Sequence, residues 1–346
     1  MGLESSMSEV ITTDVAIIGA GPVGLFAVFE AGMLGMKAVV IDALDALGGQ
    51  CTALYPEKPI YDIPGHPAID GQGLIGQLEI QAAPFAPYYL LDQQVTHLGT
   101  QEAGFRLRTS KGAVVEARAV IVAAGCGAFG PNRPPLDGLE AYEEAKTVQY
   151  LVRRREDYRD KKIVIAGGGD SAVDWALSLV EVAESVSLVH RRPKFRAAPE
   201  SLRKLDDLAK AGAVDLVVPY QLDGLEGDGG ILNGVRVATL DGQKRVIPAD
   251  VLLPFYGLAM TLGPIADWGL GLDHNHIAVE QRNSATSVPG IFAIGDIATY
   301  PGKLKLILSG FAEAAAAAHA IHPLVFPDKV LHFEYSTTRG VPTAAQ

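Results

Sequence analysis

Two stretches of this chain share one arrangement of apolar and polar positions. They are TDVAIIGAGPVGLFAVFEAGMLGMKAVVIDA (13–43) and KKIVIAGGGDSAVDWALSLVEVAESVSLVHRR (162–192). Each runs from an apolar strand through a glycine-rich turn into a helix with one apolar face, and then into a second apolar strand. In both, the first glycine of the turn lies 23 residues before the polar residue that ends the second strand. We therefore predict two βαβ units of the dinucleotide-binding kind, because a matched pair of such turns is much more specific than one.

The first turn has the glycines that a pyrophosphate needs. Gly19 permits a sharp turn, Gly21 lets the backbone approach the phosphates, and Gly24 lets the helix pack closely on the strand. The helix N-terminus then offers free N–H groups to the phosphates. Asp42 ends the second strand, where its carboxylate accepts hydrogen bonds from ribose hydroxyls and repels a phosphate, which selects FAD or NAD. The plainer alternative is that these glycines only tighten a βα loop.

The second turn repeats this design. Gly167 and Gly169 occupy the places of the first two glycines, and Ala172 occupies the place of the third. Asp170 and Ser171 follow at the start of the helix and belong to the expected NADPH site. The chain thus binds two different dinucleotides, which indicates a flavin enzyme reduced by a nicotinamide.

The strand after the second turn ends in positive charge. His190, Arg191 and Arg192 follow it, with Arg196 four residues later. A 2′-phosphate would meet fork-shaped cationic donors here. Charge-assisted hydrogen bonds contribute about 1.5–3 kcal/mol each, which predicts a preference for NADP over NAD of about ten- to thousand-fold. The alternative is a solvated basic turn.

Composition limits the class of protein further. A chain of 346 residues predicts about two domains, and 40 acidic against 29 basic side chains argue against nucleic acid and anionic membranes as general partners. No apolar run is long enough to cross a membrane. The two cysteines, Cys51 and Cys126, form neither a disulfide framework nor a metal cluster by spacing, so we expect a cytoplasmic protein with no metal site. Residues 1–6 are expected to be an expression remnant or a frayed leader, with Met7 as the native start.

Further motifs extend the picture over nearly the whole chain. Beside the first unit with Asp42 they are VIVAAG (120–125), GGGDSAVDWAL followed by HRRPKFRA, and GIFAIGDIA (290–298). In these the chain resembles the thioredoxin-reductase-like flavoproteins. The resemblance implies an α/β fold of two Rossmann-like three-layer domains, with an NADPH-binding domain inserted in a discontinuous FAD-binding domain. It assigns residues 8–126 and 258–346 to the FAD domain and 127–257 to the NADPH domain.

The redox disulfides of those flavoproteins have no counterpart here. Thioredoxin reductases carry a CxxC pair before the NADPH-domain strand, where this chain has Leu151 and arginines. Glutathione reductases place a second cysteine five residues after the first, where this chain has Pro56 after Cys51. Electrons therefore do not leave through a protein disulfide, which excludes reduction of thioredoxin or glutathione. Cys51 is expected to be a small packing residue, with a redox centre as the alternative.

One branch keeps this scaffold without its disulfide and adds a C-terminal extension that covers the flavin. The chain is similar to this branch, the thioredoxin-reductase-like ferredoxin–NADP⁺ oxidoreductases, in GGQCTALYPEKPIYDIPG (48–65), FGPNRPPLDG (129–138), HRRPKFRA (190–197) and HFEYSTTRG (332–340). The resemblance implies a set of FAD contacts: Asp42, Gln50, Tyr55, Val95, Phe129, Asp296 and Thr337. It also places Tyr55 and Tyr335 on opposite faces of the isoalloxazine and Thr337 near N5, so these three are the expected catalytic residues. Half-buried packing is the alternative for both tyrosines.

The reaction implied by the resemblance has two halves. NADPH delivers a hydride to flavin N5, which requires parallel rings about 3–3.5 Å apart, and the flavin then exchanges single electrons with ferredoxin or flavodoxin. Two alternatives remain. One is an NADPH oxidase, diaphorase or other reductase that lacks a disulfide, and the other is a flavoprotein that binds nucleotides as a sensor.

Ferredoxins are generally acidic, so docking needs locally basic surface on this acidic chain. The candidates are Arg153, Arg154, Arg155, Arg159, Lys161 and Lys162 before the second unit, and Lys303 and Lys305 after Asp296. A solvated charge run on a linker explains the first group equally well. The resemblance also implies a homodimer.

Overall fold

The chain divides into two compact units. The computed structural model describes residues 10–331, 337 and 340–341. Unit 1 comprises the chain up to Ala128 and again from Met260, and unit 2 comprises Phe129–Ala259. Both boundaries lie two residues beyond the ones expected from the sequence. Unit 2 is therefore an insertion in a unit that is discontinuous in sequence.

Unit 1 is built on a seven-stranded sheet in the order β5-β2-β1-β8-β7-β6, with β20 also paired to β8. Its strands are β1 (Val10–Ile18), β2 (Ala38–Ile41), β5 (Tyr88–Leu90), β6 (Val95–Gln101), β7 (Gly104–Thr109), β8 (Val114–Val122) and β20 (Ile291–Ala293). Strands β5, β2, β1, β8 and β20 run parallel, whereas β6 and β7 form an antiparallel meander. Alternate residues of β1 enter different cores: Val15 and Ile17 on one face, Ala16 and Ile18 on the other. Burial on both faces explains the continuous apolar run of this strand.

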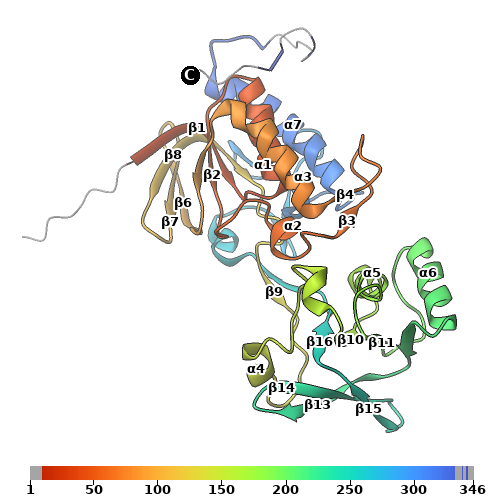
Figure 1. Ribbon diagram of the computed structural model, residues 1–346. Coiled ribbons are helices and arrows are strands. Elements are labelled where there is room, and N and C mark those ends of the chain that lie inside the picture. The colour runs from red at the N-terminus through yellow and green to blue at the C-terminus, as the bar shows by residue number, and fades with distance from the viewer. Residues whose placement is uncertain (1–9, 332–336, 338–339, 342–346) are drawn as a thin grey trace, which may run out of the picture. The chain divides into compact units, whose positions relative to one another are not determined.

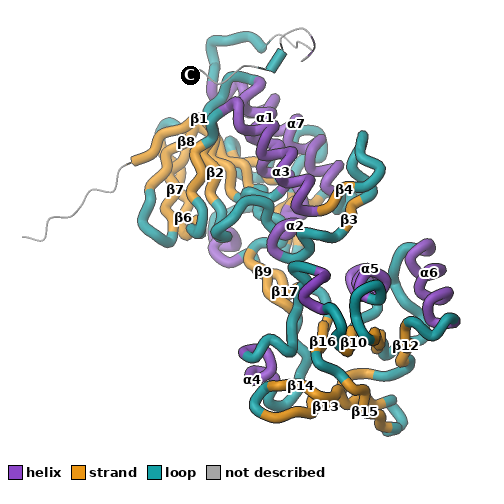
Figure 2. The backbone as a smooth tube through the Cα atoms, in the orientation of Figure 1, coloured by secondary structure: helices purple, strands orange, loops and turns teal. Residues whose placement is uncertain are grey.

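The helices of unit 1 lie beside this sheet (Figure 1). They are α1 (Pro22–Met33), α2 (Gln50–Ala53), α3 (Gly71–Ala82) and α7 (Ile307–Val325). Helix α1 packs against both α3 and α7, as the three neighbouring purple helices in Figure 2 show. The short strands are β3 (Pro59–Ile60), β4 (Ile69–Asp70), β18 (Leu272–Asp273), β19 (His276–Ala278) and β21 (Ala298–Thr299). Three alanines of α7, Ala314, Ala317 and Ala318, are buried in the core beside the sheet, as close helix packing requires.

Unit 2 has three layers. The middle layer is a parallel sheet in the order β12-β11-β10-β16, and β13-β14-β15 form an antiparallel sheet that packs on one face of it. The strands are β10 (Lys162–Ala166), β11 (Ser185–Val189), β12 (Val214–Val217), β13 (Gln221–Asp228), β14 (Ile231–Ala238), β15 (Lys244–Pro248) and β16 (Val251–Pro254). The helices are α4 (Leu139–Glu144), α5 (Asp170–Leu179) and α6 (Pro199–Lys210). Helices α5 and α6 contact the parallel sheet.

The two chain crossings between the units pair with each other. They are β9 (Ala128–Pro131) and β17 (Leu258–Thr261), which form a two-stranded ribbon. The predicted α/β class, with two parallel-sheet domains of which one is inserted in the other, is therefore confirmed.

Candidate functional site

The first glycine turn, between β1 and α1, has no room for a side chain at Gly19 or at Gly24. Gly19 has a φ of +114°, and a Cβ there would lie 2.3 Å from the carbonyl oxygen of Ala123. A Cβ on Gly24 would lie 2.0 Å from the carbonyl oxygen of Gly19. In contrast, a Cβ on Gly21 would meet nothing within 4 Å, and no side chain among the described residues caps α1. The N-terminus of α1 therefore presents open, positively polarised backbone, which fits a pyrophosphate.

Asp42 lies beside this turn at the end of β2. Its Oδ2 accepts a hydrogen bond from Ala20 N at 2.6 Å, and its Oδ1 accepts one from Leu44 N at 2.8 Å. Burial raises the pKa of Asp42, and these two backbone hydrogen bonds partly oppose the rise. Each oxygen keeps a further lone pair, so the carboxylate is held in place and is still able to accept a ribose hydroxyl.

A group of polar and aromatic side chains surrounds the start of α2. Gln50 Nε2 lies 3.3 Å from Cys126 Sγ, and Cys51 Sγ lies 3.7 Å from the Tyr55 hydroxyl. Cys51 is only 1% exposed, and burial, aided by the charge of Asp296, raises the pKa of its thiol to about 11. The thiol is therefore protonated at neutral pH, which agrees with a packing residue and not with a reactive thiolate. Burial likewise raises the pKa of Tyr55, with Cys51 and Asp296 adding to the rise, so the phenol stays neutral.

Asp296 sits in a short turn that a residue of α7 holds in place. The carboxylate of Glu313 accepts hydrogen bonds from Gly295 N and from the Tyr300 hydroxyl, both at 2.8 Å, and forms an ion pair with Lys303. The side chains of this ion pair are 4% and 5% exposed. Glu313 was not among the residues expected at the site, although it is the one charged residue in the alanine-rich helix α7. Lys303, an expected docking residue, is instead buried against Glu313 and is not available to a docking protein.

Of the remaining residues expected at the flavin, the structure describes the side chains of some and not of others. Val95 is buried at the start of β6, and Thr337 is exposed. Phe129 lies in β9, but its side chain is outside the described set, as is Tyr335 entirely. Lys305 is exposed, with its Nζ 2.5 Å from Nε2 of His276.

The second turn, between β10 and α5, encloses a different set of side chains. A Cβ on Gly167 would lie 2.6 Å from the carbonyl oxygen of Phe255, and one on Gly168 would lie 2.3 Å from the ring of His190. Gly169 faces open space. Asp170 is the first residue of α5, and its Oδ1 accepts a hydrogen bond from Ala198 N at 3.0 Å.

A pocket of about 680 Å³ opens over this turn. This is within the size range of small-molecule and cofactor sites. It brings together all but two of the residues expected to bind NADPH, since neither Asp170 nor Ser171 lines it. The lining residues come from five segments of unit 2: Pro134, Pro135, Gly167, Gly168, Gly169, Val189, His190, Arg191, Arg192, Arg196, Tyr220, Gln221, Leu222, Phe255, Tyr256 and Gly257.

The pocket carries unneutralised positive charge. Arg191, Arg192 and Arg196 are exposed, and no ion pair joins any of them to an acidic side chain in the described part of the chain. Burial lowers the pKa of His190, and the charges of the three arginines lower it further. His190 is therefore a neutral ring at pH 7, and the arginines supply the charge.

The other basic cluster is largely neutralised. Four of its six residues pair with carboxylates: Arg154 with Asp157 at 3.2 Å, Arg155 with Glu181 at 2.7 Å, Arg159 with Glu156 at 2.6 Å and Lys162 with Glu184 at 3.6 Å. This pairing favours the solvated linker over a docking surface. Within the described ranges there is no group of metal-ligating side chains and no helix long and apolar enough to cross a membrane.

Comparison with known proteins places the chain in a family. A family model for pyridine nucleotide-disulphide oxidoreductases matches residues 13–320. The Ferredoxin–NADP reductase of Granulibacter bethesdensis is 65% identical over 338 residues, which cover 98% of this chain and 97% of that protein. The protein of the same name from Paramagnetospirillum magneticum is 64% identical over 331 residues, 95% of this chain and 98% of its own.

Solved structures support the same fold. The thioredoxin reductase of T. acidophilum superimposes with a TM-score of 0.78 at 24% identity, over 90% of this chain and 98% of its own. The thioredoxin reductase of Lactococcus lactis gives 0.76 at 24% identity, over 91% and 99%. The predicted thioredoxin-reductase-like fold and the predicted branch are both confirmed. This chain belongs to the pyridine nucleotide-disulphide oxidoreductase family and, within it, to the ferredoxin–NADP reductases.

Proposed function

We propose that this chain is an FAD-dependent ferredoxin–NADP⁺ reductase that moves electrons between NADP(H) and ferredoxin or flavodoxin. The observation that carries the proposal is the contrast between its two glycine turns. The first ends at a carboxylate, Asp42, and the second opens into a pocket with three exposed arginines that form no ion pair with the described residues. The names of its relatives support both NADP and ferredoxin as reactants.

FAD fits the first unit. The open backbone at Gly21 and the uncapped N-terminus of α1 would hold the pyrophosphate, and Asp42 would bind the ribose. When bound, FAD exchanges a hydride with the nicotinamide and single electrons with the iron–sulfur partner. Tyr55 would present a neutral aromatic face that excludes water, and Gln50 and Asp296 would offer polar groups close to it.

NADP(H) fits the pocket of unit 2. Arg191, Arg192 and Arg196 would bind the 2′-phosphate, while Gly169 and the start of α5 would receive the pyrophosphate. The neutral ring of His190 covers Gly168 and would supply a flat wall without adding charge. Asp170 and Ser171 would complete the site at the first turn of the helix.

The route by which electrons leave depends on the cysteines. Both thiols are free, and the chain has only these two. Cys51 is buried and protonated, so no dithiol is available to pass electrons to thioredoxin or glutathione. A one-electron carrier such as ferredoxin can take electrons from a reduced flavin directly, without a protein thiol. Free thiols also support a reducing, cytoplasmic setting. We retain the homodimer, and the roles of Phe129, Tyr335 and Thr337 at the flavin, as parts of this proposal.

Anaerobic titration with NADPH, followed by ferredoxin-coupled reduction of a cytochrome, tests the proposal. We expect bleaching of the flavin band by NADPH, slow bleaching by NADH, rapid turnover with ferredoxin and none with thioredoxin. Faster use of NADH would contradict the assignment of the arginines. Equal turnover with oxygen alone would favour an oxidase or diaphorase, and reduction without turnover on any acceptor would favour a sensor.

A further inference from the structure

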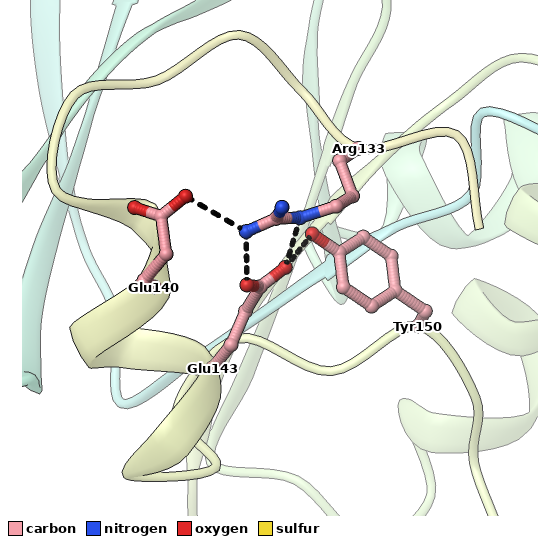
Figure 3. Close-up of polar contacts among 4 residues, drawn as sticks. All are labelled: Arg133, Glu140, Glu143 and Tyr150. Atoms are coloured by element: carbon pink, nitrogen blue, oxygen red, sulfur yellow. Dashed lines mark hydrogen bonds and ion pairs between the residues drawn. The ribbon is translucent and has the colours of Figure 1, made fainter. Parts of the chain in front are cut away.

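A fourth arginine, Arg133, directly precedes two lining residues of the pocket proposed to bind NADP(H), which we call the NADP pocket. Unlike Arg191, Arg192 and Arg196, it is paired with acidic side chains. Arg133 Nε donates to Glu143 Oε1 at 2.9 Å, and its Nη2 donates to Glu143 Oε2 and to Glu140 Oε1, the latter at 3.0 Å. The Tyr150 hydroxyl donates to Glu143 Oε1 at 2.5 Å, the oxygen that also accepts from Arg133 Nε. Figure 3 shows both carboxylates and the phenol turned toward the guanidinium. We call these four residues the Arg133 clamp.

The two carboxylates of the clamp neutralise the charge of Arg133. Two carboxylates face one guanidinium, so it has no net positive charge to offer to a phosphate, unlike Arg191 and Arg192. Partial burial by itself would raise the pKa of Glu143, but the hydrogen bonds from Arg133 and Tyr150 lower it overall, which keeps the carboxylate ionised. A fork-shaped cation on a planar carboxylate gives a fixed direction as well as attraction.

The fixed direction matters because two prolines come directly after Arg133 in the chain. Pro134 and Pro135 line the NADP pocket. Proline has no backbone N–H, so neither residue has a backbone donor with which to hold its own place. The segment is instead fastened just before them. Asn132 N donates to Gly257 O at 3.0 Å and its Nδ2 donates to Tyr256 O at 3.2 Å. Arg133 joins the segment to Glu143 of α4, which also accepts from Tyr150.

We propose that Arg133 is a positioning residue for NADP(H): through the Arg133 clamp it holds Pro134 and Pro135 as one wall of the nucleotide pocket. The inference rests on the proposed function, because it needs that pocket to bind NADP(H). The wall offers no charge and no hydrogen-bond donor, so it contributes equally to binding of the phosphorylated and unphosphorylated coenzymes. Arg191, Arg192 and Arg196 determine the preference for NADP(H) over NAD(H), whereas Arg133 determines where Pro134 and Pro135 lie.

Arg133→Ala in the FAD-loaded enzyme tests this by calorimetric titration with NADP⁺ and with NAD⁺. We expect the Kd for both to rise by about three- to tenfold, with their ratio unchanged, as loss of a partly exposed network predicts. Glu143→Gln, which keeps the side-chain shape, gives a smaller rise in the same direction. Tyr150→Phe, which removes one hydrogen bond, gives the smallest rise.

Arg203 supplies the matched control. It makes a bidentate pair with Glu200, at 3.1 and 2.6 Å, on the surface of α6 in the same unit, and it does not line the pocket. Arg203→Ala should leave both Kd values at the wild-type level. An equal rise in Arg203→Ala would overturn the inference, because the effect would then be a general loss of surface charge.

Two other outcomes would also overturn it. One is an unchanged Kd in both Arg133→Ala and Glu143→Gln. The other is a loss of NADP⁺ preference in Arg133→Ala, which would make Arg133 a direct phosphate ligand. A wild-type enzyme that binds no NADP⁺ would instead refute the proposed function itself, so the two failures are distinguishable.

Discussion

The two βαβ units differ in their side chains while sharing a backbone frame. Positions 148 residues apart make the same hydrogen bonds: Gly19 N to Ile41 O at 2.8 Å, and Gly167 N to Val189 O at 3.0 Å. The correspondence extends beyond the strand, because Gly48 N donates to Ala20 O at 2.8 Å and Arg196 N donates to Gly168 O at 2.6 Å.

What differs is the chemistry carried at matched positions. Where unit 1 has Asp42, whose carboxylate accepts from the turn, unit 2 has His190, whose ring covers the turn. Where unit 1 has Gly48, unit 2 has Arg196. Under the proposed function, one frame would serve two nucleotides, because the backbone would receive the pyrophosphate that they share and the side chains would distinguish the riboses in which they differ.

The largest expected effect concerns the third glycine position. In Gly24→Ala, the new Cβ would lie 2.0 Å from a backbone oxygen, so we expect a loss of about 3 kcal/mol in the free energy of unfolding and a protein without FAD. The absorbance ratio of flavin to protein and the melting temperature measure this.

Two variants serve as controls for Gly24→Ala. Gly76→Ala in α3, where a Cβ meets nothing within 4 Å, should keep FAD and increase the free energy of unfolding by about 0.5–1 kcal/mol. Unit 2 already has alanine at the matched position, Ala172, so Ala172→Gly should leave NADP⁺ binding intact.

The next largest effect concerns the arginines of unit 2, which should affect NADPH and not FAD. Replacing Arg191 and Arg192 together by alanine should raise the KM for NADPH by about ten- to thousand-fold and leave the KM for NADH and the FAD content nearly unchanged. Steady-state kinetics with both coenzymes measure the ratio. An unchanged preference for NADPH would show that the pocket does not select the 2′-phosphate through these side chains.

Asp42→Asn should have a smaller effect, confined to unit 1. The amide keeps one acceptor but loses the charge that binds Ala20 N, so we expect FAD to bind about tenfold more weakly, with no change in NADP⁺ binding. Fluorescence of released FAD on dilution measures this. Asp14→Asn is the matched control, because Asp14 accepts one backbone bond, from Lys37 N at 2.8 Å, on the surface of the same unit. Equal FAD release from both variants would remove the special role of Asp42.

The smallest effect is a dependence on pH in unit 2. The pKa of His190 in the folded protein is below its ordinary value of 6.5, so the unfolded chain binds a proton first as the pH falls. His190 therefore lowers stability as the pH falls from about 6.5 toward its folded pKa. His190→Phe keeps the ring packing against Phe195 but removes the titrating group. The melting temperature of the variant minus that of the wild type should therefore be larger at pH 5.5 than at pH 7.5. The same difference at both pH values would contradict a lowered pKa at His190.

The sequence was sufficient for features that neighbouring residues define. The spacing of glycines after an apolar strand, the charge at Asp42 and at Arg191, and the lack of a second cysteine near Cys51 are all local. Local patterns of this kind fix backbone turns and electrostatic sign, because both depend on residues a few positions apart.

Only the tertiary structure decided which charges are available. The sequence predicted an exposed cation at Lys303, but the fold buries it against Glu313 of α7, and the arginines around position 154 are paired with acids. Arg133 carried no signal of its own, since its proposed role depends on its contacts with Glu140 and Glu143 of α4, and Glu143 also accepts from Tyr150. The physical reason is that an ion pair forms between side chains that the fold brings together, whereas a sequence gives charges without their partners.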